Sequence, residues 1–221
     1  MTGALPRRRS LRTLLRCRRG VSATEFALML PMFLGVLGAG TELCFIMLTS
    51  MKVQRLATMT ADLVARGGAS DHRLTESQMY DIFYAMDVAA EPLKVRERGR
   101  VIVSAVMGQD TNRDGDGDVN QIMWQRFDGA LTDVPRKIGC WSISNVTTGI
   151  PRQLNAGEPL FHAQVSYAYE PVFSQMLVNW LQVPEVITRT ATFRGRGAIF
   201  HPMMAVEGFD PKTDCLSPDG L

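Results

Sequence analysis

The sequence contains little of the chemistry that an active site needs. Its three histidines, His72, His162 and His201, lie far apart and outside any HExxH or CxxC pattern. The glycine-containing stretch at residues 194–197 lacks the lysine and the following helix that a phosphate-binding loop requires. A lone histidine is more often a packing or surface residue than a ligand. We therefore expect no enzymatic activity and no required cofactor.

Acidic residues are absent from the first 20 positions, which hold seven arginines. The remaining chain has 17 basic and 22 acidic residues, a formal charge of −5, so the mildly basic isoelectric point belongs to the N-terminal stretch. The composition therefore gives no reason to expect nucleic-acid binding. We interpret residues 1–20 as a separate basic leader.

Basic residues are absent from residues 26–51, where Glu42 is the one charged side chain. As a helix rising about 1.5 Å per residue, this apolar run exceeds the ~30 Å hydrocarbon core of a bilayer. It is also too long for the ~7–15-residue apolar region of a cleaved secretory signal. The arginines outweigh Lys52 and Arg55, which predicts a single-pass membrane protein with a cytoplasmic N-terminus and everything after about residue 51 on the outer side.

The pattern after the apolar run predicts an α+β head. One long helix is expected over residues 21–68, with apolar positions spaced three and four apart beyond the membrane, and the head over residues 69–221. A capped second helix is predicted at residues 75–90. Alternating β-branched and aromatic residues predict four strands, at residues 101–106, 121–127, 160–169 and 186–193. We expect these strands to form an antiparallel sheet packed on a helix.

The junction of leader and apolar run resembles the signal cut by a prepilin peptidase. Gly20 follows two arginines, and Glu25 and Phe26 stand at the fifth and sixth positions of the chain that would begin at Val21. Glycine leaves room for a protease cleft, and the arginines hold the junction at the cytoplasmic face. The resemblance implies processing after Gly20. It also implies that Glu25 pairs with the freed α-amine of a neighbouring subunit, since a carboxylate beside hydrocarbon needs a cationic partner.

The similarity extends from Arg18 to about Arg66, which resembles the TadE-like family of tight-adherence (Tad) pilus proteins. The residues that carry it are Arg19-Gly20, Glu25-Phe26-Ala27-Leu28, Pro31, Glu42-Leu43, Gln54 and Ala57. The resemblance implies a minor pilin or pseudopilin, with Glu25, Pro31 and Glu42 in assembly. It also implies a prepilin peptidase, other pilin-like subunits, inner-membrane pilus assembly proteins and membrane lipid as partners. The expected location is the inner membrane, with a periplasmic C-terminus, and incorporation into an extracellular pilus.

Glu42 permits two interpretations. In the first, tilt and snorkelling bring its carboxylate to the outer membrane interface. In the second, it is a buried acid that pairs with another subunit or a machine component. Nearby glycines at positions 35, 38 and 40 would allow another helix to approach closely, although they form no strict GxxxG motif.

The four cysteines divide between compartments. Cys17 belongs to the leader and Cys44 to the apolar run, which leaves Cys140 and Cys215 on the oxidising side, where one disulfide can persist. The alternative is a pair of free buried thiols.

An acidic segment between two predicted strands has the ligand spacing of a calcium loop. Its glycine at position six, Gly115, permits the sharp turn, and its oxygen-bearing residues are Asp110, Asn112, Asp114, Asp116, Asp118 and Gln121. Gln121 replaces the usual bidentate glutamate, and Gly117 replaces an apolar residue at position eight. A solvated turn is the alternative to a calcium site.

Three roles follow from these patterns. The leading hypothesis is a processed pilin-like subunit. The others are an uncleaved inner-membrane scaffold of the pilus machine, and an adhesive or ligand-binding head stabilised by calcium.

Overall fold

The computed structural model describes most of the chain outside the leader. The described residues are 21–67, 73–144, 146–147, 149–172, 179, 182, 184–195 and 200–221. Gly20, Cys17 and His72 lie outside them.

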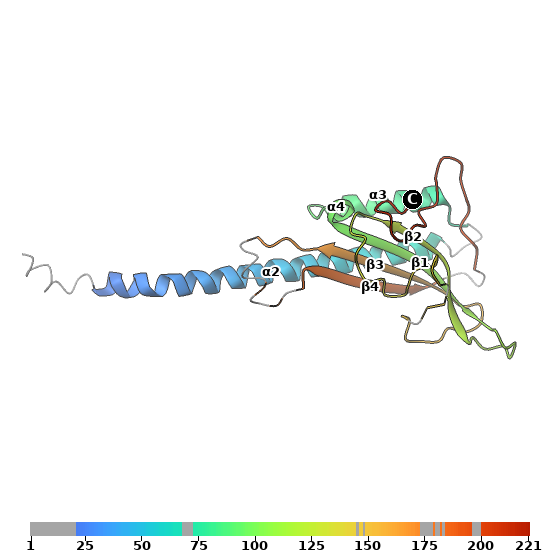
Figure 1. Ribbon diagram of the computed structural model, residues 1–221, viewed down its shortest axis with the longest axis horizontal. Helices are drawn as coiled ribbons and strands as arrows, with labels where there is room; N and C mark the ends of the chain where they lie inside the picture. Colours follow the sequence, from blue (N-terminus) through green and yellow to red (C-terminus); the bar gives the residue numbers. More distant parts are fainter. Residues whose placement is uncertain are drawn as a thin grey trace, which may run out of the picture.

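One helix, α2 (Val21–Gly67), runs through 47 residues. Pro31 lies inside it, and Arg66 in the last turn precedes the terminal glycine, as the sequence predicted. The N-terminal half of α2 projects from the molecule as a bare helix, whereas its C-terminal half lies against the sheet (Figure 1).

Two shorter helices belong to the head. In α3 (Glu76–Ala90), the Thr75 side chain accepts a hydrogen bond from the Gln78 N–H, and the Gln78 side chain caps the Thr75 N–H in return. This capping box fixes the predicted start of the helix. The single turn α4 (Val95–Arg98), which the sequence did not predict, leads into the sheet.

Four strands form one antiparallel sheet of order β2-β1-β3-β4. They are β1 (Gly99–Gln109), β2 (Val119–Asp128), β3 (Pro159–Ala168) and β4 (Val186–Arg194). All four predicted strands are confirmed, and the fold is α+β. The acidic segment is the turn of the β1–β2 hairpin, and a bulge interrupts that pairing at Ala105 and Val106.

The two faces of the sheet have different covers. Helices α2 and α3 pack on one face, where Leu56, Phe83, Val103 and Val165 belong to a single buried cluster. Full burial of such side chains stabilises the fold by about 1.5–3 kcal/mol each. The other face is covered by the β2–β3 connection and by the C-terminal tail, as the second and third clusters show.

Candidate membrane anchor and assembly helix

The first half of α2 has an apolar surface that the rest of the described chain leaves bare. Large side chains such as Phe26, Leu28 and Met32 are 65%, 81% and 77% exposed. Among the described residues, one helix, Ser22–Gly67, is long and apolar enough to cross a membrane. Such a surface is stable in lipid or against other apolar helices, because water would have to hydrate it otherwise.

From Glu42, which is fully buried, one side of the helix lies against the head. The Glu42 carboxylate accepts a hydrogen bond of 2.7 Å from the Tyr169 hydroxyl and one of 3.2 Å from the Val172 N–H. Two turns further on, the Arg189 guanidinium of β4 donates to the Ser50 hydroxyl at 2.6 Å. The head therefore rests on α2 from Glu42 onward.

This contact adds a third possibility to the two interpretations of Glu42. The carboxylate has hydrogen-bond partners in its own head, and these hold the start of the β3–β4 connection against the helix. Burial raises the pKa of Tyr169, and the hydrogen bond to the Glu42 carboxylate raises it further. Tyr169 therefore stays protonated and remains a donor.

Replacing Glu42 by alanine is expected to lower the free energy of unfolding of the head by about 1.5–3 kcal/mol, because the Tyr169 hydroxyl and the Val172 N–H lose a charged acceptor. Urea unfolding of the full chain in neutral detergent, followed by tryptophan fluorescence, measures the change. Glu25→Ala is the matched control, since Glu25 is exposed on the same helix. Equal midpoints for the two variants would contradict the assigned role of Glu42.

The other predicted assembly residues lie on the bare part of the helix. Glu25 and Pro31 are exposed, and no ion pair joins Glu25 to any other residue that the structure describes. A Cβ built at Gly35, Gly38 or Gly40 would meet no atom within 4 Å. Gly20 lies outside the described residues, and Val21 is the first residue of α2.

In the acidic loop, backbone N–H groups of the loop itself donate hydrogen bonds to two of the carboxylates. Asp118 Oδ2 accepts from the N–H groups of Thr111 and Asn112, and the Asp110 carboxylate accepts from those of Arg113 and Gly115. No group of three or more His, Cys, Asp or Glu side chains is placed to hold a metal within the described part of the chain.

Two further predicted ligands, Asp114 and Gln121, lie in different places, one in the turn and one in strand β2. The pKa of Asp114 is lowered, mainly because its carboxylate accepts a hydrogen bond from the Asp116 N–H and also because it accepts one from the Asn112 side chain. Gln121 lies within β2, where it pairs with Met107 of β1. Calcium binding stays a prediction, which is tested by whether calcium raises the unfolding midpoint in wild type but not in Asp114→Asn.

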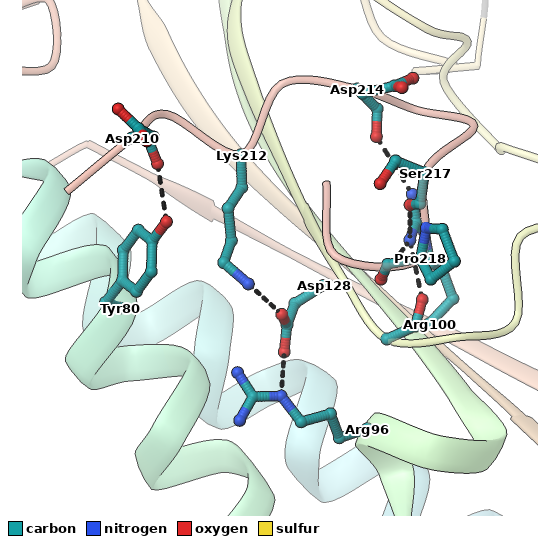
Figure 2. Close-up of polar contacts among 10 residues, drawn as sticks. Tyr80, Arg96, Arg100, Asp128, Asp210, Lys212, Asp214, Ser217 and Pro218 are labelled. Atoms are coloured by element: carbon teal, nitrogen blue, oxygen red, sulfur yellow. Dashed lines mark hydrogen bonds and ion pairs between the residues drawn. The ribbon is translucent and has the colours of Figure 1, made fainter. Parts of the chain in front are cut away.

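The predicted disulfide is present and fastens the C-terminal tail. Cys140 of the β2–β3 connection is bonded to Cys215, with their Cα atoms 6.4 Å apart, while Cys44 is a free, exposed thiol. Figure 2 shows the tail's polar contacts, in which Lys212 pairs with Asp128.

The buried Arg100 is the centre of the second group of tail contacts. Its guanidinium donates to the carbonyl groups of Ser217, Pro218 and Asp214 (Figure 2). It also donates to the Gly129 carbonyl. Desolvation lowers the pKa of Arg100 from its ordinary value. No local sequence pattern marks Arg100 as buried, because its partners lie 29 to 118 residues away.

His162 is buried in β3, on the sheet face away from the helices. It is 4% exposed, and its Nδ1 has no hydrogen-bond partner within the described residues. Burial lowers the pKa of His162 to about 4, because the imidazolium cation would lose its hydration. This agrees with the packing role expected for a lone histidine.

The head should therefore lose stability as the pH falls. Between the ordinary pKa of 6.5 and about 4, the unfolded chain binds a proton that the folded chain excludes, so stability is complete above 6.5 and falls below it. The loss by pH 4 is on the order of 3 kcal/mol. Urea unfolding at pH 7 and pH 4.5 should show a smaller difference for His162→Gln than for wild type. His201→Gln is the matched control for replacing a histidine of the head.

Comparison with known proteins finds a family similarity in α2. The family model of TadE-like proteins matches residues 20–62, which run from Gly20 through most of α2. No curated protein matches the chain, and no solved structure matches it. The match confirms the resemblance found in the sequence: residues 20–62 of this chain are similar to TadE-like proteins.

Proposed function

We propose that this chain is a minor pilin or pseudopilin of a Tad-type pilus or related secretion system, matured by a prepilin peptidase after Gly20. The observation that carries the proposal is the division of α2 within the TadE-like match. Its first half is apolar and bare, and its second half is built into the core of the head. Its role is association, and no reaction is catalysed.

The length of the bare segment supports this proposal. Residues 22–41 precede Glu42, which is hydrogen-bonded to the head. As a helix, these 20 residues span about 30 Å, the thickness of the hydrocarbon core. The head would then stand at the outer surface of the membrane, and the same segment could pack among other apolar helices after extraction.

Glu25 supports an assembly role for the bare segment. A carboxylate in an apolar helix is costly unless it is paired, and the structure gives Glu25 no ion pair within the described chain. Cleavage after Gly20 creates an α-amine at Val21. We infer that Glu25 pairs with this amine of a neighbouring subunit.

The test is the N-terminal sequence and the intact mass of protein purified from membranes of a host that carries the cognate peptidase. Wild type is expected to begin at Val21, whereas Gly20→Ala keeps the leader. Pili sheared from the cells should contain the processed chain. An intact leader in both proteins would instead assign the chain to the uncleaved inner-membrane scaffold, which would retain the seven arginines on the cytoplasmic side.

A further inference from the structure

The two edges of the sheet are covered to different extents. At the β2 edge, the Thr147 N–H donates to the Asn120 carbonyl at 3.0 Å, and the Lys212 carbonyl accepts from the Phe127 N–H at 2.9 Å. Two segments of the chain therefore bond to the backbone of β2 on its outer side. Natural sheets commonly cover their edges in this way, because unpaired backbone groups bind other strands.

The β4 edge has no such cover among the described residues. The Tyr169 N–H bonds the Glu185 carbonyl and the Gly195 N–H bonds the Pro159 carbonyl, at the two ends of an unbroken β3–β4 register. Along an antiparallel strand, alternate residues direct their backbone N–H and C=O groups toward the neighbouring strand. In β4 these are the odd-numbered residues, which bond to β3. The outward backbone groups belong to Val186, Thr188, Thr190, Thr192 and Arg194.

Only one of these outward groups has a partner within the described part of the chain. The Thr190 carbonyl accepts a hydrogen bond of 3.4 Å from the Gln54 side chain of α2. Among the described residues, the N–H groups of Thr188, Thr190, Thr192 and Arg194 have no hydrogen-bond acceptor, which leaves them open to a further strand.

A basic cavity of about 530 Å³ lies beside this edge, on the sheet face away from the helices. Thr190, Thr192 and Arg194 line it from β4, and Lys137 and Arg152 line it from the β2–β3 connection. His162 of β3 also lines this cavity.

One carboxylate balances part of this positive charge. Glu158 is bonded by Arg152 at 3.0 Å and by Arg194 at 2.8 Å. Lys137 has no ion pair with any residue that the structure describes. The three cations therefore exceed the one anion, and the cavity attracts negative charge.

We propose that the outer edge of β4 binds an extended acidic peptide segment of a partner protein, which joins the sheet as a fifth strand. Its backbone bonds the outward groups of β4, and its alternate side chains place carboxylates beside Lys137 and Arg194. The backbone provides affinity, and the basic cavity selects acidic side chains. This surface belongs to the head and does not depend on cleavage after Gly20.

The test uses the full chain in neutral detergent and two fluorescein-labelled nine-residue peptides, one alternating valine with glutamate and one alternating valine with lysine. Fluorescence anisotropy should show binding of the glutamate peptide and at least about tenfold weaker binding of the lysine peptide. Lys137→Gln should weaken binding several-fold, with a smaller dependence on salt. Absence of binding, or equal binding of both peptides, would overturn the proposal.

Thr190→Pro separates strand addition from simple charge attraction. The N–H of Thr190 points away from β3, and proline is tolerated at such an edge position. The variant should therefore keep its urea midpoint and bind the glutamate peptide about tenfold more weakly. Amide hydrogen exchange in wild type gives the same information without a substitution, since the peptide should protect the N–H groups of Thr188 and Thr192. Unchanged affinity in a folded Thr190→Pro variant, or no protection at these two amides, would refute strand addition.

Discussion

Replacing both Cys140 and Cys215 by serine is expected to lower the free energy of unfolding of the head by about 4 kcal/mol. The bond joins residues 75 positions apart, and its loss restores the conformational entropy of that long loop to the unfolded chain. Urea unfolding of the full chain in neutral detergent, followed by tryptophan fluorescence, measures the loss.

The control for this experiment is Cys44→Ser. Cys44 is the free, exposed cysteine of α2, so its replacement should leave the midpoint unchanged. Limited proteolysis measures the protection of the C-terminal tail itself. The tail, which contacts Arg100 of β1, should be cut earlier once Cys215 is released. A double variant with the midpoint of the Cys44→Ser control would show that Lys212 and Arg100 hold the tail without the disulfide.

Glu76→Leu is expected to lower the free energy of unfolding by about 3–5 kcal/mol, because it leaves the Arg126 guanidinium buried without its counter-ion. The Arg126 Nε lies 3.1 Å and 3.0 Å from the two Glu76 oxygens, and both side chains are less than 10% exposed. The pair joins the first turn of α3 to β2. The same urea unfolding experiment measures the effect.

The double variant Glu76→Leu/Arg126→Met tests whether the loss of stability comes from an unpaired buried charge. Replacing both charges by apolar side chains removes the desolvation penalty together with the attraction, so the double variant should recover most of the stability. Arg126 also lies over the Trp124 ring, at 5.9 Å from its centroid, where methionine keeps an apolar contact. If the double variant is no more stable than Glu76→Leu, the loss comes from the start of α3 and not from an unpaired charge.

The elements of this fold follow from local patterns in the sequence. The run without basic residues places the apolar helix, and alternating β-branched residues place all four strands. Thr75 and Gln78 mark the start of α3 because a capping box forms within four residues. The cysteine pairing was predictable because the membrane leaves two cysteines on the outer side.

The partners of the charged residues were not predictable from local patterns. Glu42 meets Tyr169 across 127 residues, and Glu76 meets Arg126 across 50. A single sequence shows that a charge in an apolar helix needs a partner, but it does not show which one. Glu42 was therefore expected to meet another subunit or the membrane interface, and the structure gives it hydrogen-bond partners in its own head.

The sequence by itself determined the apolar helix, the capped helix α3 and the four strands, because each depends on residues a few positions apart. Tertiary structure alone decided where the head meets the helix, which charges are buried in pairs, and which sheet edge is covered. These features depend on the strand order β2-β1-β3-β4. That order, together with the packing of helices and loops over the two faces, brings together residues that no local pattern connects.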